Sequence, residues 1–498
     1  LRAAIADFRT SGKKVVAYAD AYMQPGYYLA AQADEVYLHP DGILLLEGFG
    51  RWRNHYREGL ERYGIDVHVF RVGEYKSAVE PYIRDDMSPE AREMTLDYAG
   101  DLWRTYVADV AAARKLRPED VTGLVEAMPE RLRSASGDLA KMVLEAKLVD
   151  TLAQRDEVRA RMIELVGKSE DGKTFRQVGV ETYLRARGED RSGATARGPA
   201  VAVVVAKGEI LDGTQPAGTI GGDSTARLLR RAREDDQVKA VVLRIDSPGG
   251  SSFASEIVRR ECALVREAGK PLVASMGSLA ASGGYWIATE ADEIWAAPET
   301  ITGSIGIFGV FPTVDRALAR YLGVHTDGVG TTRFSDVLRP DRPMDPAVAD
   351  MLRQFIDEGY EDFLERVSKA RRMPREAVDR VARGRVWSGE DAKGLGLVDH
   401  LGNLEQAIES ASKRAELEKG YRVGYVEKEM TLRERLATML AAQAVSLAAA
   451  AGVGQEASPR AGLPTLPGAL RAVEADVLRL SRWNDPRGVY AHCLCGEE

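Results

Sequence analysis

The chain has 498 residues, 45% hydrophobic and 29% charged, a balance typical of globular proteins that excludes wholesale disorder and collagen-like structure. The 68 Lys and Arg against 76 Asp and Glu leave a net charge of −8, which disfavours nucleic-acid binding through a basic surface. The length predicts about three domains, and no run of about 20 residues is apolar enough to predict a membrane span or a secretory signal.

The chain begins with an amphipathic stretch over residues 1–8, and after Gly12 an apolar strand is predicted over 15–18. The sequence opens with Leu1 and runs directly into these elements. We therefore expect the chain to begin inside a domain.

An internal repeat links the two halves of the chain. Residues 11–17 and 25–35 recur as 268–274 and 283–293, so that Gly-Tyr-Tyr-Leu-Ala at 26–30 matches Gly-Tyr-Trp-Ile-Ala at 284–288. Because the offset is 257 to 258 residues, Leu1 corresponds to about residue 258, and the first copy lacks about 60 residues that the second possesses. The repeat predicts a tandem duplication whose first copy is truncated at its N-terminus.

The second copy alternates strands and helices. Strands are predicted over 200–205, 240–245 and 271–275, and helices over 224–233, over 254–268 and from Ser282 onward. This alternation is typical of βαβ units, so we expect an α/β fold with a largely parallel sheet.

The predicted domain organisation has four parts. These are a partial N-terminal repeat over 1–166, a linker over 167–199 with one short strand, a C-terminal repeat over 200–425, and a helical tail over 426–498 with an Ala-rich helix at 431–454.

The cysteines predict neither a disulfide framework nor a metal site. Only Cys262, Cys493 and Cys495 are present, and the single residue between the last two makes them a poor pair for a disulfide. Zinc usually takes four ligands, and only His492 lies near this pair in the sequence. We expect no metal and no cofactor.

Two Gly-rich turns follow apolar strands, where α/β proteins bind their ligands. At 248–250 the glycines allow close approach of a substrate backbone and expose N–H groups suited to an oxyanion. At 282–284 a serine precedes a helix, the position of a nucleophile, although a helix N-cap is the simpler interpretation of Ser-Gly-Gly alone. A phosphate-binding loop is disfavoured because no Gly-Lys-Ser/Thr follows.

A nucleophilic serine requires a base. The six histidines, at 39, 55, 68, 325, 400 and 492, have no motif around them, and each is typical of a structural or surface histidine. A lysine is the alternative, but its pKa of about 10.4 must be lowered before it can accept a proton near neutrality.

Several motifs together resemble the signal peptide peptidase A family, long form, also called protease IV. They lie at 71–81, 84–88, 246–250, 280–286 and 302–308, and the resemblance reaches 483–486 and 490–493. It covers nearly the whole chain. It implies a tandem duplication of the Clp protease/crotonase-like fold with a Ser/Lys dyad divided between the two copies.

The resemblance also implies a role for each matching residue. Ser282 matches the nucleophile, Lys76 the general base, and the N–H groups of Gly250 and Gly283 the oxyanion hole. By the repeat offset, Gln24 occupies the position of Ser282 in the first copy, and Phe334 that of Lys76 in the second. Each copy is therefore expected to supply half of one composite site.

Residues beside these motifs have open interpretations. Ser77 is a candidate to orient Lys76, and Ser304 is either a support for the base or an ordinary turn serine. Tyr285 and Trp286 are expected in the core.

The family implies a serine endopeptidase that degrades cleaved signal peptides and unfolded apolar peptides. It also implies attachment to the bacterial inner membrane through an N-terminal segment outside this sequence, a catalytic part facing the periplasm, and a homotetramer. Two alternatives are an acyl-CoA enzyme of the crotonase type and an inactive membrane-associated scaffold.

Overall fold

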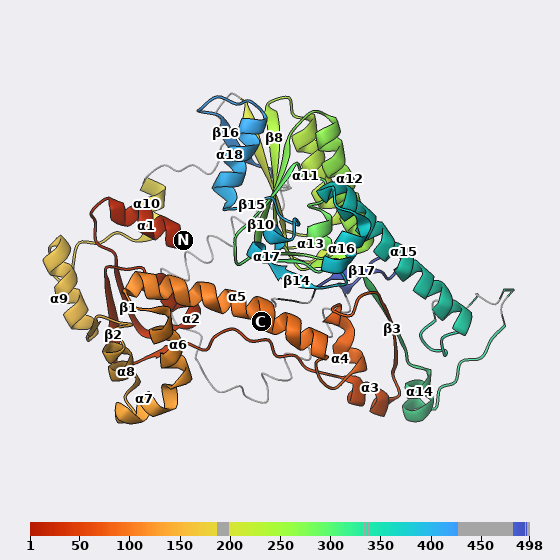
Figure 1. Ribbon diagram of the computed structural model, residues 1–498, viewed down its shortest axis with the longest axis horizontal. Helices are drawn as coiled ribbons and strands as arrows, with labels where there is room; N and C mark the ends of the chain where they lie inside the picture. Colours follow the sequence, from red (N-terminus) through yellow and green to blue (C-terminus); the bar gives the residue numbers. More distant parts are fainter. Residues whose placement is uncertain are drawn as a thin grey trace. The chain divides into compact units, whose positions relative to one another are not determined.

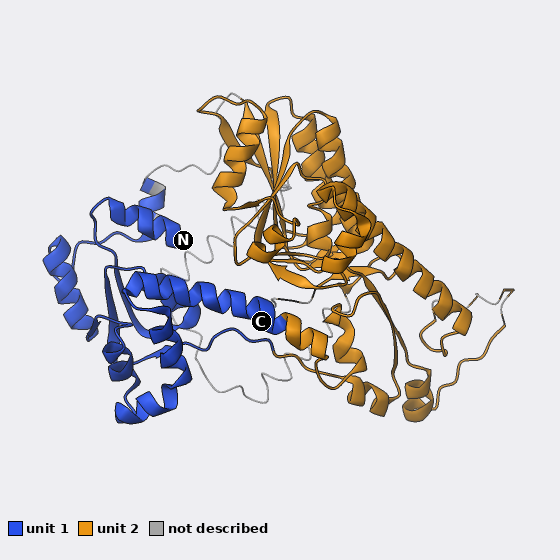
Figure 2. Ribbon diagram, viewed as in Figure 1, with its two compact units in different colours: residues 1–51, 95–192 blue, residues 52–94, 193–498 orange. Residues whose placement is uncertain are grey.

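A computed structural model describes residues 1–186, 199–329, 331–332, 335, 339–426, 482–493 and 495. The chain forms two compact units, of which unit 1 comprises 1–51 and 95–192, and unit 2 comprises 52–94 and 193–498 (Figure 2). Segment 52–94 thus belongs with the C-terminal half in space, although it precedes most of unit 1 in sequence. The domain boundaries, which rest on sequence similarity, stay a prediction.

Unit 1 contains a three-stranded parallel sheet in the order β1-β2-β4. The amphipathic stretch at the start forms α1, and the expected strand is confirmed as β1. Tyr27, Val36, Leu38 and Val110 lie in a core between this sheet and its helices. The elements are α1 (Arg2–Thr10), β1 (Val16–Met23), α2 (Gln24–Ala30), β2 (Glu35–Leu45), α5 (Pro89–Arg114), α6 (Pro118–Glu126), α7 (Met128–Ser134), α8 (Leu139–Glu145), β4 (Thr151–Leu152), α9 (Arg155–Val166) and α10 (Val180–Ala186), with the boundary between the units falling inside α5.

The main sheet of unit 2 has the order β14-β12-β10-β8-β5-β16, and beside this path β11 pairs with β10 and β15 pairs with β11. All its pairings are parallel except that of β14 with β12, so the prediction of a largely parallel α/β sheet is confirmed. The strands are β5 (Ala200–Lys207), β8 (Val238–Ser247), β10 (Leu272–Ala281), β11 (Glu293–Ala296), β12 (Ile301–Gly303), β14 (Val386–Ser388), β15 (His400–Leu401) and β16 (Arg422–Tyr425).

Both faces of this sheet are buried, which explains why its strands are continuously apolar. Along β5, Ala202 and Val204 pack into one core, whereas Val201 and Val203 pack into another. Figure 1 shows α11 and α12 on one side of these strands and α18 on the other. The helices of unit 2 are α3 (Arg57–Tyr63), η1 (Ser77–Val79), α4 (Glu80–Ile83), α11 (Gly222–Glu234), α12 (Ser252–Glu267), α13 (Gly283–Trp286), α14 (Asp315–Ala317), η2 (Leu318–Leu322), α15 (Pro346–Arg371), α16 (Arg375–Val381), α17 (Gly389–Gly394) and α18 (Leu404–Arg414).

A second sheet of unit 2 joins segments that are distant in sequence. Its order is β3-β13-β17-β9-β6-β7, with β3 antiparallel to β13. The sequence did not predict this sheet, because its strands are short and several have no apolar alternation. They are β3 (Asp66–Arg71), β6 (Ile210–Leu211), β7 (Ile220–Gly221), β9 (Gly249–Ser251), β13 (Phe308–Thr313) and β17 (Tyr490–His492).

The linker and the tail are described in part. The described portion of the linker holds a Lys168–Phe175 bridge and helix α10, whereas the predicted helix at 431–454 and Phe334 lie outside the described residues.

Cys493 and Cys495 form a disulfide, and their Cα atoms lie 5.1 Å apart, within reach of such a bond. The expectation that these two cysteines pair poorly was therefore wrong. Within the described ranges, no helix has an apolar run long enough to cross a bilayer.

Candidate active site

The candidate site lies where β8 and β10 end. These neighbouring strands are parallel, with Ala280 opposite Ser247, so both strands end at the same edge of the sheet. The Gly249–Gly250 turn follows β8, and Ser282 follows β10. The register of the sheet therefore brings together the two Gly-rich turns that the sequence singled out.

Ser282 is fully buried, with an exposed fraction of 0%, in a backbone conformation unusual for a residue with a side chain. Its φ is +58°, and its backbone nitrogen donates to the Gly303 carbonyl oxygen at 2.8 Å. Its side chain accepts no capping hydrogen bond from α13. Such strain persists only where the surroundings impose it, and it is concentrated at functional sites. The N-cap interpretation of Ser282 is therefore not supported.

Lys76 reaches this site from segment 52–94, in the loop that follows β3. The loop packs against residues 383–385, where a Cβ on Gly73 would lie 2.3 Å from the Arg383 carbonyl oxygen. Gly384, with a φ of +80°, packs directly on Lys76, since a Cβ there would lie within 2.7 Å of the Lys76 backbone. Arg71 Nη1 donates to the Lys76 carbonyl oxygen at 2.8 Å. These contacts fix the position of the lysine backbone.

The Lys76 amine has three oxygen neighbours. Its Nζ lies 2.7 Å from Ser282 Oγ, 3.1 Å from the Ser304 carbonyl oxygen and 3.1 Å from Ser304 Oγ. A neutral amine has two N–H donors and one lone pair, so it can donate to both Ser304 oxygens and accept the Ser282 hydroxyl proton.

Burial favours that neutral form. The lysine side chain is 1% exposed, and burial lowers its pKa well below the ordinary value of 10.5. The site therefore pairs a serine hydroxyl with an amine able to take its proton.

Gly250 and Gly283, the predicted oxyanion donors, lie on the two turns that meet here. Gly250 has a φ of +154°, and a Cβ on it would lie 1.9 Å from the Ile210 carbonyl oxygen, so the position requires glycine. A Cβ on Gly249 would lie 2.6 Å from the Gly283 nitrogen. The Gly283 amide is thus next to the Gly249–Gly250 turn and adjacent in sequence to Ser282.

The structure places some of the other candidate residues in the core and only one of them against the lysine amine. Tyr285 and Trp286 are buried in the main core, as predicted. Ser304 contacts the lysine amine through both its hydroxyl and its carbonyl, whereas no hydrogen bond joins the Ser77 hydroxyl to Lys76 in the described structure.

Sequence reasoning missed the direct contacts that Arg71 and Gly384 make with Lys76. Gly384 follows Lys76 by 308 residues, so no local sequence motif could have indicated that the two residues are in contact.

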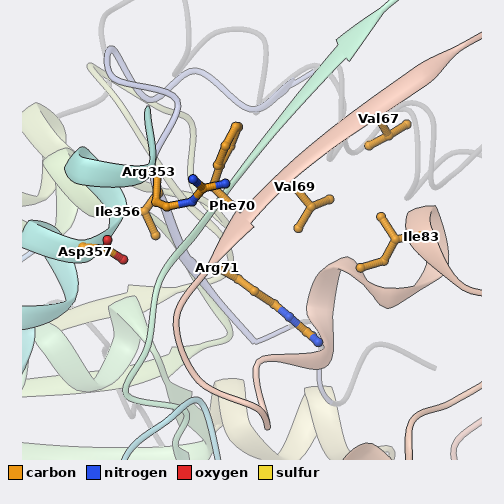
Figure 3. A pocket seen from close by; sticks show the side chains of 8 residues that line it. All are labelled: Val67, Val69, Phe70, Arg71, Ile83, Arg353, Ile356 and Asp357. Atoms are coloured by element: carbon orange, nitrogen blue, oxygen red, sulfur yellow. The ribbon is translucent and has the colours of Figure 1, made fainter. Parts of the chain in front are cut away.

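A cavity of about 410 Å³ lies beside the Lys76 loop (Figure 3). In Figure 3 the Arg71 side chain extends from β3 toward the segment that carries Ile83. Neither Lys76 nor Ser282 lines this cavity, so it is distinct from the site formed by that pair. Its lining residues are Val67, Val69, Phe70 and Arg71 of β3, Ile83 of α4, and Arg353, Ile356 and Asp357 of α15.

The described residues contain no group of three or more His, Cys, Asp or Glu side chains arranged to hold a metal ion. The pairing of Ser282 with Lys76 is an arrangement that can carry out acid–base chemistry with side chains of the protein itself.

Curated relatives cover nearly the whole chain. It is 41% identical over 491 residues to "Protease 4" of Salmonella typhi, covering 99% of this chain and 77% of that protein. It is 37% identical to "Protease 4" of Haemophilus influenzae, covering 99% of this chain and 79% of that one. "Serine protease SPPA, chloroplastic" of Arabidopsis thaliana is 31% identical, covering 86% of this chain and 62% of that protein.

Among solved structures, a ClpP1 mutant from Listeria monocytogenes matches with a TM-score of 0.28 and 14% identity, covering 41% of this chain and 94% of that one. This likeness is too low to assign a fold family. By contrast, Peptidase family S49 matches residues 7–168 and 265–418, more than half of the chain. Together with the curated relatives, this match confirms the predicted relationship to signal peptide peptidase A: the chain belongs to peptidase family S49 and is a serine peptidase.

Proposed function

We propose that this chain is a serine endopeptidase in which Ser282 is the nucleophile and Lys76 the general base. The observation that carries the proposal is the distance of 2.7 Å between Lys76 Nζ and Ser282 Oγ. Both side chains are buried, and the lowered pKa of Lys76 leaves its lone pair free to accept a proton.

In the first half of the reaction, Lys76 takes the Ser282 hydroxyl proton as Oγ attacks the carbonyl carbon of a peptide bond. The negative charge that develops on the carbonyl oxygen is stabilised by the backbone N–H groups of Gly250 and Gly283. When the tetrahedral intermediate collapses, the C–N bond breaks, and the protonated Lys76 gives its proton to the leaving amine. An ester between Ser282 and the substrate's acyl group remains.

In the second half, water replaces the amine. Neutral Lys76 takes a proton from this water, whose oxygen attacks the ester, and then returns the proton to Ser282 Oγ. The Ser304 carbonyl and hydroxyl oxygens hold the lysine amine in place throughout. No metal or cofactor takes part in these steps.

The substrates, location and assembly that we propose rest on the family resemblance. The substrates are cleaved signal peptides and other unfolded apolar peptides. The chain works at the bacterial inner membrane with its catalytic part toward the periplasm, as a homotetramer. We also propose that the two halves are tandem copies of the Clp protease/crotonase-like fold, the first lacking its N-terminal part, since the family matches two separate segments of this chain.

The test is hydrolysis of an apolar, signal-like peptide by the parent chain, Ser282→Ala and the matched control Ser412→Ala. Ser412 is also buried, but its hydroxyl donates to the Glu409 carbonyl in α18. We expect cleavage to disappear only in Ser282→Ala. Equal cleavage by all three would remove Ser282 from the mechanism. Absence of any cleavage would favour the scaffold, and binding of acyl-CoA thioesters without peptide cleavage would favour the crotonase-type enzyme.

A further inference from the structure

Strand β3 is the outermost strand at one end of the second sheet of unit 2. It pairs with β13 without a register shift, and Arg71 lies opposite Phe308. In an antiparallel ladder, the backbone groups of successive residues point alternately toward the partner strand and away from it. The Val72 nitrogen donates to the Ile307 carbonyl at 3.4 Å, and Phe308 pairs on its other side with Tyr490. The odd-numbered residues of β3 therefore point away from β13.

Three residues of β3 thus present their backbone groups along the outer edge of the strand. They are Val67, Val69 and Arg71, and within the described ranges no backbone nitrogen or carbonyl of these residues bonds to a loop or to a side chain. An unpaired edge of this kind is a template for a further strand.

The cavity of about 410 Å³ lies along the same edge. Its lining side chains come from both faces of β3, since Val69 packs with Ile83 in one cluster and Phe70 packs with Ile356 in the main core. Figure 3 shows Val69 and Ile83 on one side of the strand and Phe70 on the other. Because β13 fills one edge of β3, a cavity that reaches both faces lies at the other edge.

The chemistry of this edge fits an extended apolar peptide. Such peptides add to sheet edges through backbone hydrogen bonds, and pockets take their alternate side chains. The half-buried side chains of Val67, Val69 and Ile83 supply an apolar wall. The wall formed by α15 carries one charge of each sign, on Arg353 and Asp357, so the cavity favours neither a polyanion nor a polycation.

The same edge is connected to the lysine of the candidate site. Arg71 is the last residue of β3, and its Nη1 donates to the Lys76 carbonyl at 2.8 Å. This nitrogen also lies 3.6 Å from Oε1 of Glu80, a buried carboxylate. A strand added beside β3 would form its last backbone bonds with the residue that holds the Lys76 loop.

We propose that the outer edge of β3 is an exosite, a second binding site for substrate, which takes a remote part of an extended apolar peptide as an additional strand. The inference rests on the proposed function of the Ser282 site. β3 is three strands from β9, which at about 4.8 Å per strand is about 14 Å. An extended chain covers about 3.3 Å per residue, so only peptides several residues longer than the segment being cut reach the exosite.

The first test places a proline at the edge. Val69→Pro removes an N–H that faces outward, a change that edge strands tolerate because the ladder to the neighbouring strand keeps its hydrogen bonds. The matched control is Val423→Pro in β16, the outermost strand of the main sheet. The Arg422 and Val426 nitrogens donate toward β5, so the N–H of Val423 faces outward too.

Hydrolysis is measured with apolar peptides of about 8 and about 20 residues. We expect Val69→Pro to raise KM about tenfold for the longer peptide only, as the loss of one or two backbone hydrogen bonds predicts. Val423→Pro should leave KM unchanged for both. An equal change for both lengths in Val69→Pro, or no change for either, overturns the exosite.

A second test does not depend on catalysis, and it replaces the first if Val69→Pro does not fold. In the Ser282→Ala background, a fluorescent form of the longer peptide should bind about tenfold more weakly when Ile83→Asp is added, because a carboxylate replaces part of the apolar wall. Ile408→Asp, at a half-buried isoleucine of α18, is the control. If Ser282→Ala cleaves like the parent chain but binding is weakened, the proposed function fails and the exosite stands. If cleavage requires Ser282 but binding is unchanged, the exosite fails alone.

Hydrogen exchange provides a third test without any change in β3. The amides of Val67, Val69 and Arg71 are followed in the Ser282→Ala chain with and without saturating longer peptide. We expect their exchange to slow when the peptide is bound, because the added strand accepts from them. Fast exchange that persists at saturation overturns the proposal. Slow exchange without peptide that increases with chain concentration would mean that a second copy covers this edge, and this also overturns it.

Discussion

Two helix starts, one in each unit, show how similar local structure leads to different chemistry. In unit 1 the chain leaves β1 and enters α2 with Gln24, and in unit 2 it leaves β10 and enters α13 with Ser282. The Gln24 amide is bonded to backbone on both sides, since Oε1 accepts from the Glu47 and Gly48 nitrogens and Nε2 donates to the Gly48 carbonyl. Ser282 Oγ instead lies against the amine of Lys76.

The difference teaches that the kind of partner, rather than the number of hydrogen bonds, separates these two positions, since Ser282 Oγ is also bonded twice, to Lys76 Nζ and to the Gly306 carbonyl oxygen. The side chain of Gln24 ties a loop to a helix, and its hydrogen bonds make it a poor participant in chemistry. The hydroxyl of Ser282 lies 2.7 Å from the buried amine of Lys76, whose pKa burial lowers, so a proton can move between the two groups. The experiments below remove the Lys76 amine, displace it, follow its titration, or alter Gln24.

The largest expected effect is that of Lys76→Met. Removing the amine leaves Ser282 with no base, and we expect kcat/KM for an apolar peptide to fall by about 10³-fold or more. Lys76→Arg should be no better, because a guanidinium stays protonated. The matched control is Lys270→Met, whose amine donates to the Ala232 and Asp235 carbonyls and which precedes β10, whereas Ser282 follows that strand. Near-parent activity of Lys76→Met would exclude this lysine as the base.

Gly384→Ala comes next. A methyl group there would overlap the Lys76 backbone, and the φ of +80° disfavours any residue except glycine, so the amine shifts away from Ser282. A displacement of about 1 Å lowers kcat about 10- to 100-fold, with KM nearly unchanged. Gly394→Ala, in α17 with open space around it, is the control. If both variants keep the parent kcat, the lysine loop does not depend on this contact.

The pH profile should show the titration of the buried amine. Protonated Lys76 cannot accept a proton, so kcat/KM should rise about tenfold per pH unit and then level off. Because burial lowers the pKa of Lys76, the plateau should begin well below pH 10.5. Measuring kcat/KM from pH 5 to 10 checks this, and activity that stays flat down to acid pH contradicts it.

The same titration affects stability. Between the lowered pKa and 10.5, the unfolded chain binds a proton on Lys76 that the folded chain does not, so the free energy of unfolding rises with pH. The contribution is at most about 1.4 kcal/mol per pH unit. Denaturant unfolding at several pH values should show that Lys76→Met lacks this slope, and equal slopes for both chains would contradict the assignment.

The smallest effect on activity is expected from Gln24→Ser, which places the residue of unit 2 in unit 1. It loses hydrogen bonds to Glu47 and Gly48, so we expect a stability loss of about 1–3 kcal/mol and no new hydrolytic activity when Ser282→Ala is also present. Urea unfolding and peptide hydrolysis measure the two outcomes. New activity at this serine would show that the helix start itself, and not its partner, makes the nucleophile.

The parallel strands and the two Gly-rich turns could be predicted from the sequence because their signals are local. Apolar runs such as 200–205 and the glycines at 249–250 and 283–284 indicate strands and tight turns without reference to the rest of the chain. The pairing of Ser282 with Lys76 was reached through family resemblance, since nothing near residue 76 distinguishes a buried lysine from a solvated one.

The second sheet and the positioning contacts could not be predicted in this way. Strands β9 and β17 are three residues each, and they join residues more than 200 positions apart, so neither has the alternation that indicates a strand. The close packing of Gly384 on Lys76 likewise depends on two loops that meet only in the folded chain.

The assembly of the site from distant segments has a consequence for biosynthesis. Lys76 and Ser282 are separated by 206 residues, and at about 5–20 residues per second a ribosome needs about 10–40 s to make the chain between them. On the proposed mechanism, the nascent chain carries the base without its nucleophile during that interval. A truncated translation product that ends before Ser282 would then lack the proposed peptidase activity, because its nucleophile has not yet been added.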